Sequence, residues 1–358
     1  MNEVADLFPD DHFQSTMTTI QICDGLHFFY TDSGEPTVKA ESSAAYRTFI
    51  IIHGHSFHSG TFQRLFPLAS SRNVRIICIN RRGYPGSTPY TNDEDRIITS
   101  GTDEERRDFL HRQGADLATF VHRIIQQQDL SKEGGITLVG WSMGNIFLLA
   151  TIVALVGHVD VEVKSNLLKF IKSVVLWDPP IEALGIPKLR EAAIPLWDPK
   201  APPEDRRKFF IEWAASYFQH GDLSTHDTTQ LNFRTPDASK PPTITTMTPG
   251  ELSSAVDFTA TGGLDTAILG NDFASTLNHQ MRKALFDPVI TQEVWMRTPL
   301  YHLYGDACPW TIIHAAWVVR DEVRKMKAPL KEVVIEGANH FPMWDIPEVA
   351  LDTLCRCL

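Results

Sequence analysis

Residues 140–144 of this 358-residue chain read Gly-Trp-Ser-Met-Gly, and they make Ser142 the first candidate for chemistry. The segment has the form G-X-S-X-G and stands directly between an apolar strand pattern and an apolar helix pattern. A side chain at Gly140 or Gly144 would collide with its surroundings in so tight a turn, which holds the serine in a strained conformation with its hydroxyl exposed. The alternative is a serine that only caps the helix. We predict that Ser142 is a nucleophile.

A serine hydroxyl attacks a carbonyl group efficiently only when a base removes its proton. The chain contains 14 histidines that compete for this role. His340 follows the last strand pattern, in a loop with the small residues Gly337 and Ala338 that leads into a helix beginning near Pro347. Its alternative role is capping or packing. We predict that His340 is the base.

The elements that must position these residues are visible as short apolar runs alternating with longer helical patterns. Continuous apolar runs, rather than alternating ones, are typical of strands buried on both faces of a parallel sheet. Strands that alternate with helices predict an α/β fold with a mostly parallel sheet. The predicted strands are 18–23, 27–32, 48–54, 74–80, 135–141, 172–178, 299–305 and 331–337, and the clearest helices are 108–128, 145–158, 309–323 and 347–357.

One long interval, residues 181–295, breaks this alternation. It contains no convincing strand pattern, and an insertion of this length between two sheet strands is more often a cap than a loop. Its helical pattern at 205–221 is rich in aromatic residues, which predicts a roofed, largely apolar pocket for a medium-sized organic molecule. The aromatic candidates in this interval are Trp197, Phe209, Phe210, Trp213, Tyr217 and Phe218.

Composition narrows the class of protein. Apolar residues make up 43% of the chain and charged residues 22%, as in an ordinary globular enzyme. The net charge of −11, with no basic block, argues against nucleic acid or an anionic membrane as the main partner. Acidic residues at the start of the chain, where a secretory signal would be basic, and five scattered cysteines favour a cytoplasmic location. The oligomeric state is left open.

Three further segments give the chain a resemblance to the α/β-hydrolase superfamily over nearly its whole length. "IIIHGHS" (50–56) resembles the strand and oxyanion loop of that family, and "NRRGYPGST" (80–88) resembles a conserved turn, with Asn80 in place of the usual aspartate. "EGANHFPMWDIPE" (336–348) is similar to the segment that presents the catalytic histidine. The resemblance implies a mostly parallel eight-stranded sheet flanked by helices, with a helical cap after the sixth strand. Residues 1–180 and 296–358 would form the core, and 181–295 the cap.

The same resemblance implies an oxyanion hole made of two backbone N–H groups. They belong to Met143, which follows the nucleophile, and to His55, which follows the His53–Gly54 pair. His53 is then expected to shape this loop. Preorganised donors of this kind stabilise the charge that develops on the carbonyl oxygen.

The acid that orients the histidine has two candidate positions. In the commoner family arrangement it lies three residues after the glycine that ends strand 299–305, but Cys308 occupies that position, and a thiol supplies no fixed charge at neutral pH. Asp306 is near but out of register. In a second arrangement, found in haloalkane dehalogenases and in fungal lactone hydrolases of the zearalenone-degrading type, the acid follows the preceding strand. That position is Asp178, which we favour over Asp306.

These residues together predict a serine hydrolase that cleaves a carboxylic ester or lactone through an acyl-enzyme. A serine nucleophile argues against epoxide hydrolysis and dehalogenation. No dinucleotide fingerprint or metal-ligand cluster stands out in the sequence, so no cofactor and no metal are expected. Two alternatives stay open: non-hydrolytic chemistry on the same scaffold, such as C–C cleavage, lyase or cyclase steps, and a ligand-binding protein with little turnover.

Overall fold

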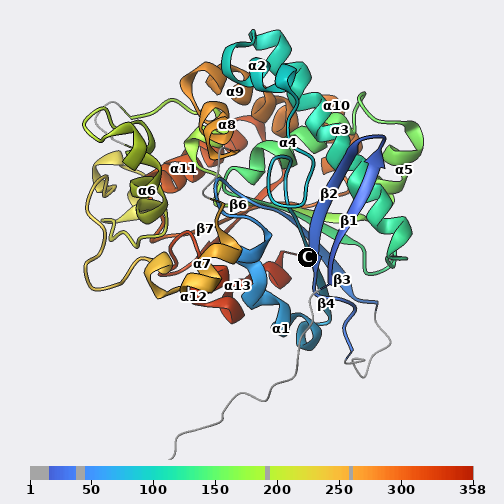
Figure 1. Cartoon of the computed structure of the whole chain (residues 1–358), viewed down its shortest axis with the longest axis horizontal. Helices are drawn as coiled ribbons and strands as arrows, with labels where there is room; N and C mark the ends of the chain where they lie inside the picture. Colours follow the sequence, from blue (N-terminus) through green and yellow to red (C-terminus); the bar gives the residue numbers. More distant parts are fainter. Residues whose placement is uncertain (1–15, 38–44, 190–193, 258–260, 358) are drawn as a thin grey trace, which may run out of the picture.

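The computed structural model describes residues 16–37, 45–189, 194–257 and 261–357. At its centre lies a sheet of eight strands in the order β1-β2-β4-β3-β5-β6-β7-β8 (Figure 1). Strand β2 is antiparallel to both β1 and β4, whereas all pairs from β4 to β8 are parallel. The strands are β1 Thr16–Cys23, β2 Leu26–Asp32, β3 Arg47–Ile52, β4 Val74–Ile79, β5 Ile136–Trp141, β6 Ile171–Trp177, β7 Leu300–Gly305 and β8 Leu330–Ile335. The predicted fold class is confirmed.

Helices cover both faces of this sheet, which is why the central strands are buried at nearly every position and mostly apolar. Ile50 and Ile52 of β3 belong to one hydrophobic core, and Phe49 and Ile51 belong to the other, because successive side chains point to opposite faces. In Figure 1 the two groups of helices lie on opposite sides of the sheet. The first group is α3 Asp103–Gln127, α4 Gly144–Ala154, α5 Val161–Phe170 and α11 Trp310–Met326, and the second is α1 Phe66–Ala69, α12 Pro342–Asp345 and α13 Pro347–Arg356.

Helix α3 begins five residues before the predicted start at Asp108. The Thr102 hydroxyl accepts a hydrogen bond from the backbone N–H of Glu105, and the Glu105 carboxylate accepts one from the backbone N–H of Thr102. This capping box starts the helix in a polar segment. The apolar periodicity that predicts the helix does not extend into this segment. A second capping box, between Thr91 and Glu94, starts the helix α2 Asn92–Ser100, which the apolar pattern also misses.

The segment between β6 and β7 contains helices and irregular structure, and within its described residues it forms no strand, as predicted. Helix α9 does not roof the sheet but packs against α3 and α4. The helix predicted over 205–221 is shorter, since α6 ends at Ala214. The helices of this segment are α6 Pro203–Ala214, α7 Pro249–Ala255, α8 Thr261–Ile268, α9 Asn271–Phe286 and α10 Pro288–Ile290.

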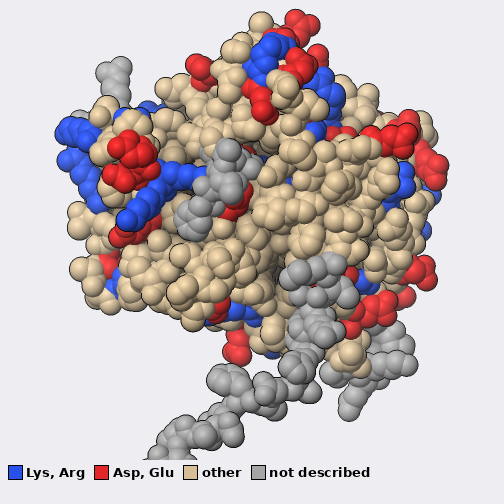
Figure 2. Space-filling view, in the orientation of Figure 1, with Lys and Arg blue, Asp and Glu red and all other residues tan. Residues whose placement is uncertain are grey.

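The described surface carries charges of both signs. On the face shown in Figure 2, basic side chains gather over and around α6 with acidic ones beside them, both signs meet near the top edge, acidic groups prevail along the right edge, and a wide uncharged area lies between. None of the helices in the described part of the chain combines the length and the apolar character that crossing a bilayer requires.

The contact between α3 and α4 yields a test of packing. A methyl group at Gly114 of α3 would lie 2.2 Å from the carbonyl oxygen of Ala150 in α4. Gly114→Ala should therefore lower the free energy of unfolding by about 1–3 kcal/mol, although alanine ordinarily favours a helix. Urea unfolding measures this change. Gly250→Ala in α7 is the control, since no atom lies within 4 Å of its added methyl group, and an equal loss in both variants would contradict the packing account.

Candidate active site

Ser142 lies on the sharp turn between β5 and α4. Its φ angle is +56°, in the left-handed region that non-glycine residues rarely adopt. A methyl group at Gly144 would lie 2.1 Å from the carbonyl oxygen of Ile52, so this position requires glycine. The Asn145 side chain stabilises the turn by donating to the carbonyl oxygens of Ser142 (2.8 Å) and Trp177 (3.0 Å). The strained turn predicted from the sequence is therefore present.

His340 lies in the loop that follows β8, and neighbouring elements hold this loop in place. The Asp306 carboxylate accepts a hydrogen bond of 2.6 Å from the backbone N–H of Gly337. The Trp141 indole N–H donates to the backbone carbonyl of His340 (3.1 Å), and the two rings stack with their centroids 4.7 Å apart. His340 is 5% exposed, so its ring position is determined by packing.

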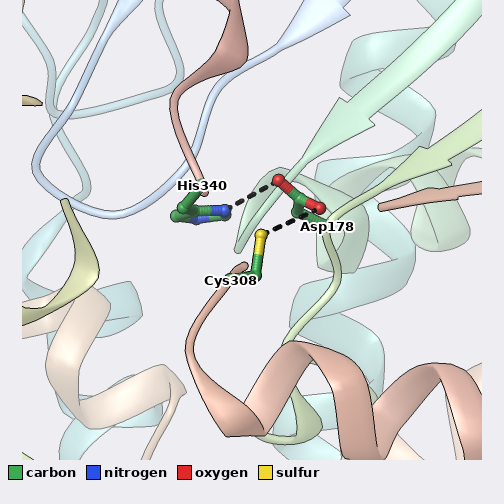
Figure 3. Close-up of side chains that lie close together, drawn as sticks. All are labelled: Asp178, Cys308 and His340. Atoms are coloured by element: carbon green, nitrogen blue, oxygen red, sulfur yellow. Dashed lines mark hydrogen bonds and ion pairs between the residues drawn. The ribbon is translucent and has the colours of Figure 1, made fainter. Parts of the chain in front are cut away.

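The His340 ring is hydrogen-bonded to Asp178, which directly follows β6 (Figure 3). Nδ1 of His340 lies 3.0 Å from Oδ2 of Asp178. Because a carboxylate only accepts, Nδ1 carries the hydrogen and Nε2 is left free to act as a base. Burial raises the pKa of Asp178. Three hydrogen bonds lower it by a smaller amount, and they come from His340, the backbone N–H of Gly305 (3.1 Å) and the Cys308 thiol.

The structure also places the two other residues considered for the acid. Cys308 occupies the commoner family position, and its sulfur lies 3.6 Å from Oδ1 of Asp178. Burial and the neighbouring Asp178 raise the pKa of this thiol well above its usual range, so it donates to the carboxylate as a neutral group. Asp306 bonds to Gly337, as described above, rather than to the His340 ring. Asp178 is thus the carboxylate that contacts the histidine.

The loop after β3, which contains His53 and His55, packs directly against Ser142. A methyl group at Gly54 would lie 2.8 Å from the Ser142 Cβ. Nε2 of His53 accepts from the backbone N–H of Arg81 (3.0 Å), so its Nδ1 donates to the carbonyl oxygen of Gly54 (2.9 Å). Burial lowers the pKa of His53 well below its usual range, which keeps the ring neutral. The backbone donors predicted at Met143 and His55 flank Ser142 in this arrangement, and their role stays a prediction.

A buried ion pair connects this loop to helix α8 of the inserted segment. The Arg81 guanidinium donates to the carbonyl oxygens of His53 (3.1 Å) and Gly54 (2.9 Å), and it forms two hydrogen bonds to the Asp265 carboxylate at 3.2 and 2.6 Å. The side chains of Arg81 and Asp265 are 2% and 0% exposed. The Tyr84 hydroxyl donates to Asp265 (2.6 Å) and accepts from the backbone N–H of Ser56 (2.8 Å). Nothing in the sequence around Arg81 indicates this partner, which lies 184 positions away.

Ser142 and His340 border one pocket, which contains about 410 Å³ of space between atoms, part of it open to solvent. Its walls come from the strand ends of the core and from the inserted segment, and they are mainly apolar. Glu182 is the one carboxyl group among the bordering residues, and no motif in the sequence marks it. The bordering residues are His55, Ser142, Pro180, Glu182, Ile194, Trp197, Phe210, Trp213, Ala214, Leu269, Pro309, Thr311, Ile312 and His340.

The aromatic residues predicted for this pocket divide into two groups. Three of them border it, namely Trp197, Phe210 and Trp213. Of the others, Phe209 is 42% exposed and Phe218 is buried. The Tyr217 hydroxyl donates to Asp345 (2.7 Å). Helical spacing alone does not distinguish these roles.

Asp178, Cys308 and His340 also place three potential metal ligands within 4.8 Å of one another, among the residues that the structure describes. A thiol binds metal as the thiolate, whereas burial and Asp178 favour the neutral form of Cys308. The hydrogen bonds among the three groups already use the histidine N–H and the thiol as donors. We therefore interpret this cluster as a hydrogen-bonded unit rather than as a metal site.

Comparison with known proteins gives a consistent result. Residues 49–353 match the family model described as "Alpha/beta hydrolase family". No curated protein matches the chain significantly. Among solved structures, a protein from Burkholderia cenocepacia, provisionally assigned as an aryl esterase, has a TM-score of 0.51 and 17% identity, with 95% of this chain and 97% of that chain covered. A laboratory-evolved potato epoxide hydrolase has a TM-score of 0.50 and 12% identity, with 96% and 98% covered. At these identities the two structures support the fold alone.

The Arg81–Asp265 pair yields a test of stability. Asp265→Ala leaves a buried guanidinium without its counter-charge and should lower the free energy of unfolding by about 3–5 kcal/mol. The double variant Arg81→Met with Asp265→Leu should recover much of this loss, because both charges are then absent. Thermal and denaturant unfolding measure both changes. Glu322→Gln, which breaks the exposed Arg282–Glu322 pair, is the control and should cost less than about 1 kcal/mol. Similar losses for Asp265→Ala and Glu322→Gln would contradict this account.

Proposed function

The chain belongs to the alpha/beta hydrolase family, and we propose that it is a serine hydrolase that cleaves a carboxylic ester or lactone. Family membership supports hydrolysis in general. The finer assignment depends on the nucleophile, since a serine attacks carbonyl carbon and forms an acyl-enzyme. Ser142 stands where an aspartate would be needed for epoxide opening, which argues against the activity of the potato enzyme of similar fold.

The hydrogen bond between His340 Nδ1 and Asp178 supports this proposal most directly. It fixes the histidine tautomer with the lone pair on Nε2, in a pocket that Ser142 also borders. The nucleophile Ser142, the acid Asp178 and the base His340 then follow one another in this order along the chain, after β5, β6 and β8. Each follows the carboxyl end of a strand, where a parallel sheet brings its functional groups together.

In the proposed mechanism, the Ser142 hydroxyl adds to the substrate carbonyl while Nε2 of His340 takes its proton. The Asp178 carboxylate stabilises the resulting imidazolium. The backbone N–H groups of Met143 and His55 donate to the oxyanion. His340 next protonates the departing alcohol oxygen, which leaves an acyl group on Ser142. A water molecule, deprotonated by His340, then attacks this acyl group, and His340 returns the proton to the Ser142 oxygen as the carboxylic acid leaves.

The lining of the pocket supports a medium-sized organic substrate that is largely apolar. Trp197, Phe210 and Trp213 come from the segment between β6 and β7, and they face the strand ends that carry Ser142 and His340. We propose that residues 181–295 act as the cap of this site, apart from α9, which packs against α3 and α4. On this proposal the cap determines which substrate enters, and the strand ends determine the chemistry.

Replacing the nucleophile tests the proposal directly. Ser142→Ala should abolish hydrolysis of short p-nitrophenyl esters, with a loss of at least about a thousandfold in kcat. A fluorophosphonate probe should label the wild type at Ser142 and leave the variant unlabelled. The melting temperature serves as the control, because removing one hydroxyl from a partly exposed turn should leave folding intact. Activity within tenfold of the wild type would rule out Ser142 as the nucleophile.

Replacing the acid tests the second arrangement. Asp178→Asn keeps the shape of the side chain but favours the wrong histidine tautomer, so kcat should fall by about two to four orders of magnitude. Asp306→Asn is the matched control, because its amide oxygen still accepts from Gly337, and it should cost less than about tenfold. Steady-state kinetics on one ester measures both.

The position of Cys308 permits a stricter version of this test. In the double variant Asp178→Asn with Cys308→Asp, a carboxylate stands at the commoner family position, beside the original acid. Part of the activity lost in Asp178→Asn should return. If Asp306→Asn lowers kcat by orders of magnitude while Asp178→Asn leaves kcat nearly unchanged, the acid is assigned to the wrong strand.

A further inference from the structure

Glu182 is a carboxyl group that the proposed mechanism does not use, although it borders the same pocket as Ser142 and His340. It lies in a short 3-10 helix, Ile181–Leu184, four residues after Asp178. Glu182 is only 9% exposed, and its Oε1 atom has no hydrogen-bond partner among the residues that the structure describes. An unsatisfied carboxyl oxygen at the wall of a pocket is a place where a bound group can supply the missing hydrogen bond.

The surroundings of Glu182 limit what this ligand group is. The only charged side chain that acts appreciably on it, within the described structure, is Lys188. Lys188 Nζ lies 3.8 Å from the centroid of the Trp197 ring, which borders the pocket. Of the two histidines of the pocket, His340 is bonded to Asp178 through Nδ1 while its Nε2 serves the proposed reaction, and His55 is bonded to Thr266. Helix α11, which packs against Ile181–Leu184, contributes the uncharged Thr311 and Ile312 to the pocket wall.

Burial raises the pKa of Glu182 to about 7. A hydrogen bond from its own backbone N–H and the charge of Lys188 lower the pKa, but by less than burial raises it. Near neutral pH the group is therefore present both as a neutral acid and as a carboxylate. A hydroxyl group matches both forms, because it donates to the carboxylate and accepts from the acid. An ammonium group matches only the carboxylate, and Lys188 already supplies a positive charge there. A bare carbonyl oxygen matches only the acid.

We propose that Glu182 binds a hydroxyl group of the substrate, so that the substrate class is an apolar ester or lactone that carries a free hydroxyl group. This inference rests on the proposed function, because it assigns a second anchoring point in the pocket of Ser142. The aromatic walls bury the body of the substrate, and Glu182 selects its polar substituent. Glu182 is thus a specificity-determining residue, and an unsubstituted analogue leaves its carboxyl group unsatisfied.

Matched esters test the proposal by selectivity. One pair places the hydroxyl in the acyl half: p-nitrophenyl 3-(4-hydroxyphenyl)propanoate and p-nitrophenyl 3-phenylpropanoate. The other places it in the alcohol half: 4-hydroxybenzyl acetate and benzyl acetate. The wild type should prefer the hydroxylated member of at least one pair by about tenfold or more in kcat/KM. Glu182→Gln, which still donates and accepts, should keep most of this preference, and Glu182→Met, which has a similar length, should lose it.

Binding to the inactive Ser142→Ala protein separates this inference from the proposed function. Calorimetry with the same pairs should show the hydroxyl preference in Ser142→Ala and its loss in Ser142→Ala with Glu182→Met. If this pattern appears but the wild type cleaves no ester, the proposed function fails and the role of Glu182 stands. If the esters are cleaved with a hydroxyl preference that Glu182→Met does not change, or with none, the role of Glu182 is wrong. Stronger preference for an ester with an aminomethyl group in place of the hydroxyl also overturns it.

The pH dependence of stability tests the premise that this carboxyl group is buried and unsatisfied. The unfolded chain loses the Glu182 proton near pH 4.5, whereas the folded protein keeps it to about pH 7. Stability from this group is thus lost as the pH rises between these values. The melting temperature of Glu182→Gln, relative to the wild type, should therefore rise over the same range. A difference that does not vary with pH means that the group is solvated, which overturns the inference.

Discussion

The hydrogen bond between Asp178 and His340 joins two residues that are 162 positions apart, and the arrangement of the site depends on it. Asp178 adopts a φ angle of +46°, which is strained for an aspartate. The strain is held by the sheet, since the backbone N–H of Asp178 donates to Leu303 in β7 and its carboxylate accepts from Gly305 at the end of the same strand. The parallel register of β6, β7 and β8 therefore sets the distance between acid and base.

The chemistry at the carboxyl ends of these strands depends on the hydrogen-bond partners of each buried polar group. Asp178 is surrounded by donors: the His340 ring, the Gly305 N–H and the Cys308 thiol. Arg81 and Asp265 are satisfied within a network that also fixes the loop of His53, so a helix of the inserted segment supports the predicted oxyanion hole. Glu182 differs from both, because its Oε1 has no partner among the described residues. Burying this carboxyl group costs free energy, and it lies where a hydrogen bond from a ligand can offset that cost.

Much of this fold was predictable, because buried parallel strands are continuous apolar runs and all eight predicted runs lie within about two residues of the observed strands. The elbow at Ser142 was predictable for a steric reason, which the crowding around Gly144 bears out. The start of α3 was not, since a capping box is polar and gives no apolar period. The sequence shows that Cys308 occupies the usual acid position, three residues after Gly305, and that a thiol cannot serve there. Only the structure shows that this thiol contacts Asp178.

The long-range polar pairs were beyond sequence reasoning. Arg81 stands in a segment that was recognised, yet nothing local indicates that its partner is Asp265. Glu182 is an acidic residue in a short helix, and such a residue is usually exposed to solvent. Its burial results from the packing of α9 and α11 around it.

The central claim is that Asp178 acts only through His340. A double-mutant cycle with Asp178→Asn and His340→Ala, measured as kcat/KM on one p-nitrophenyl ester, tests it most directly. If the two residues form one unit, the double variant is no slower than His340→Ala alone, because an acid without its base has nothing to orient. Losses that multiply in the double variant would mean that the two residues act independently, and would contradict this account.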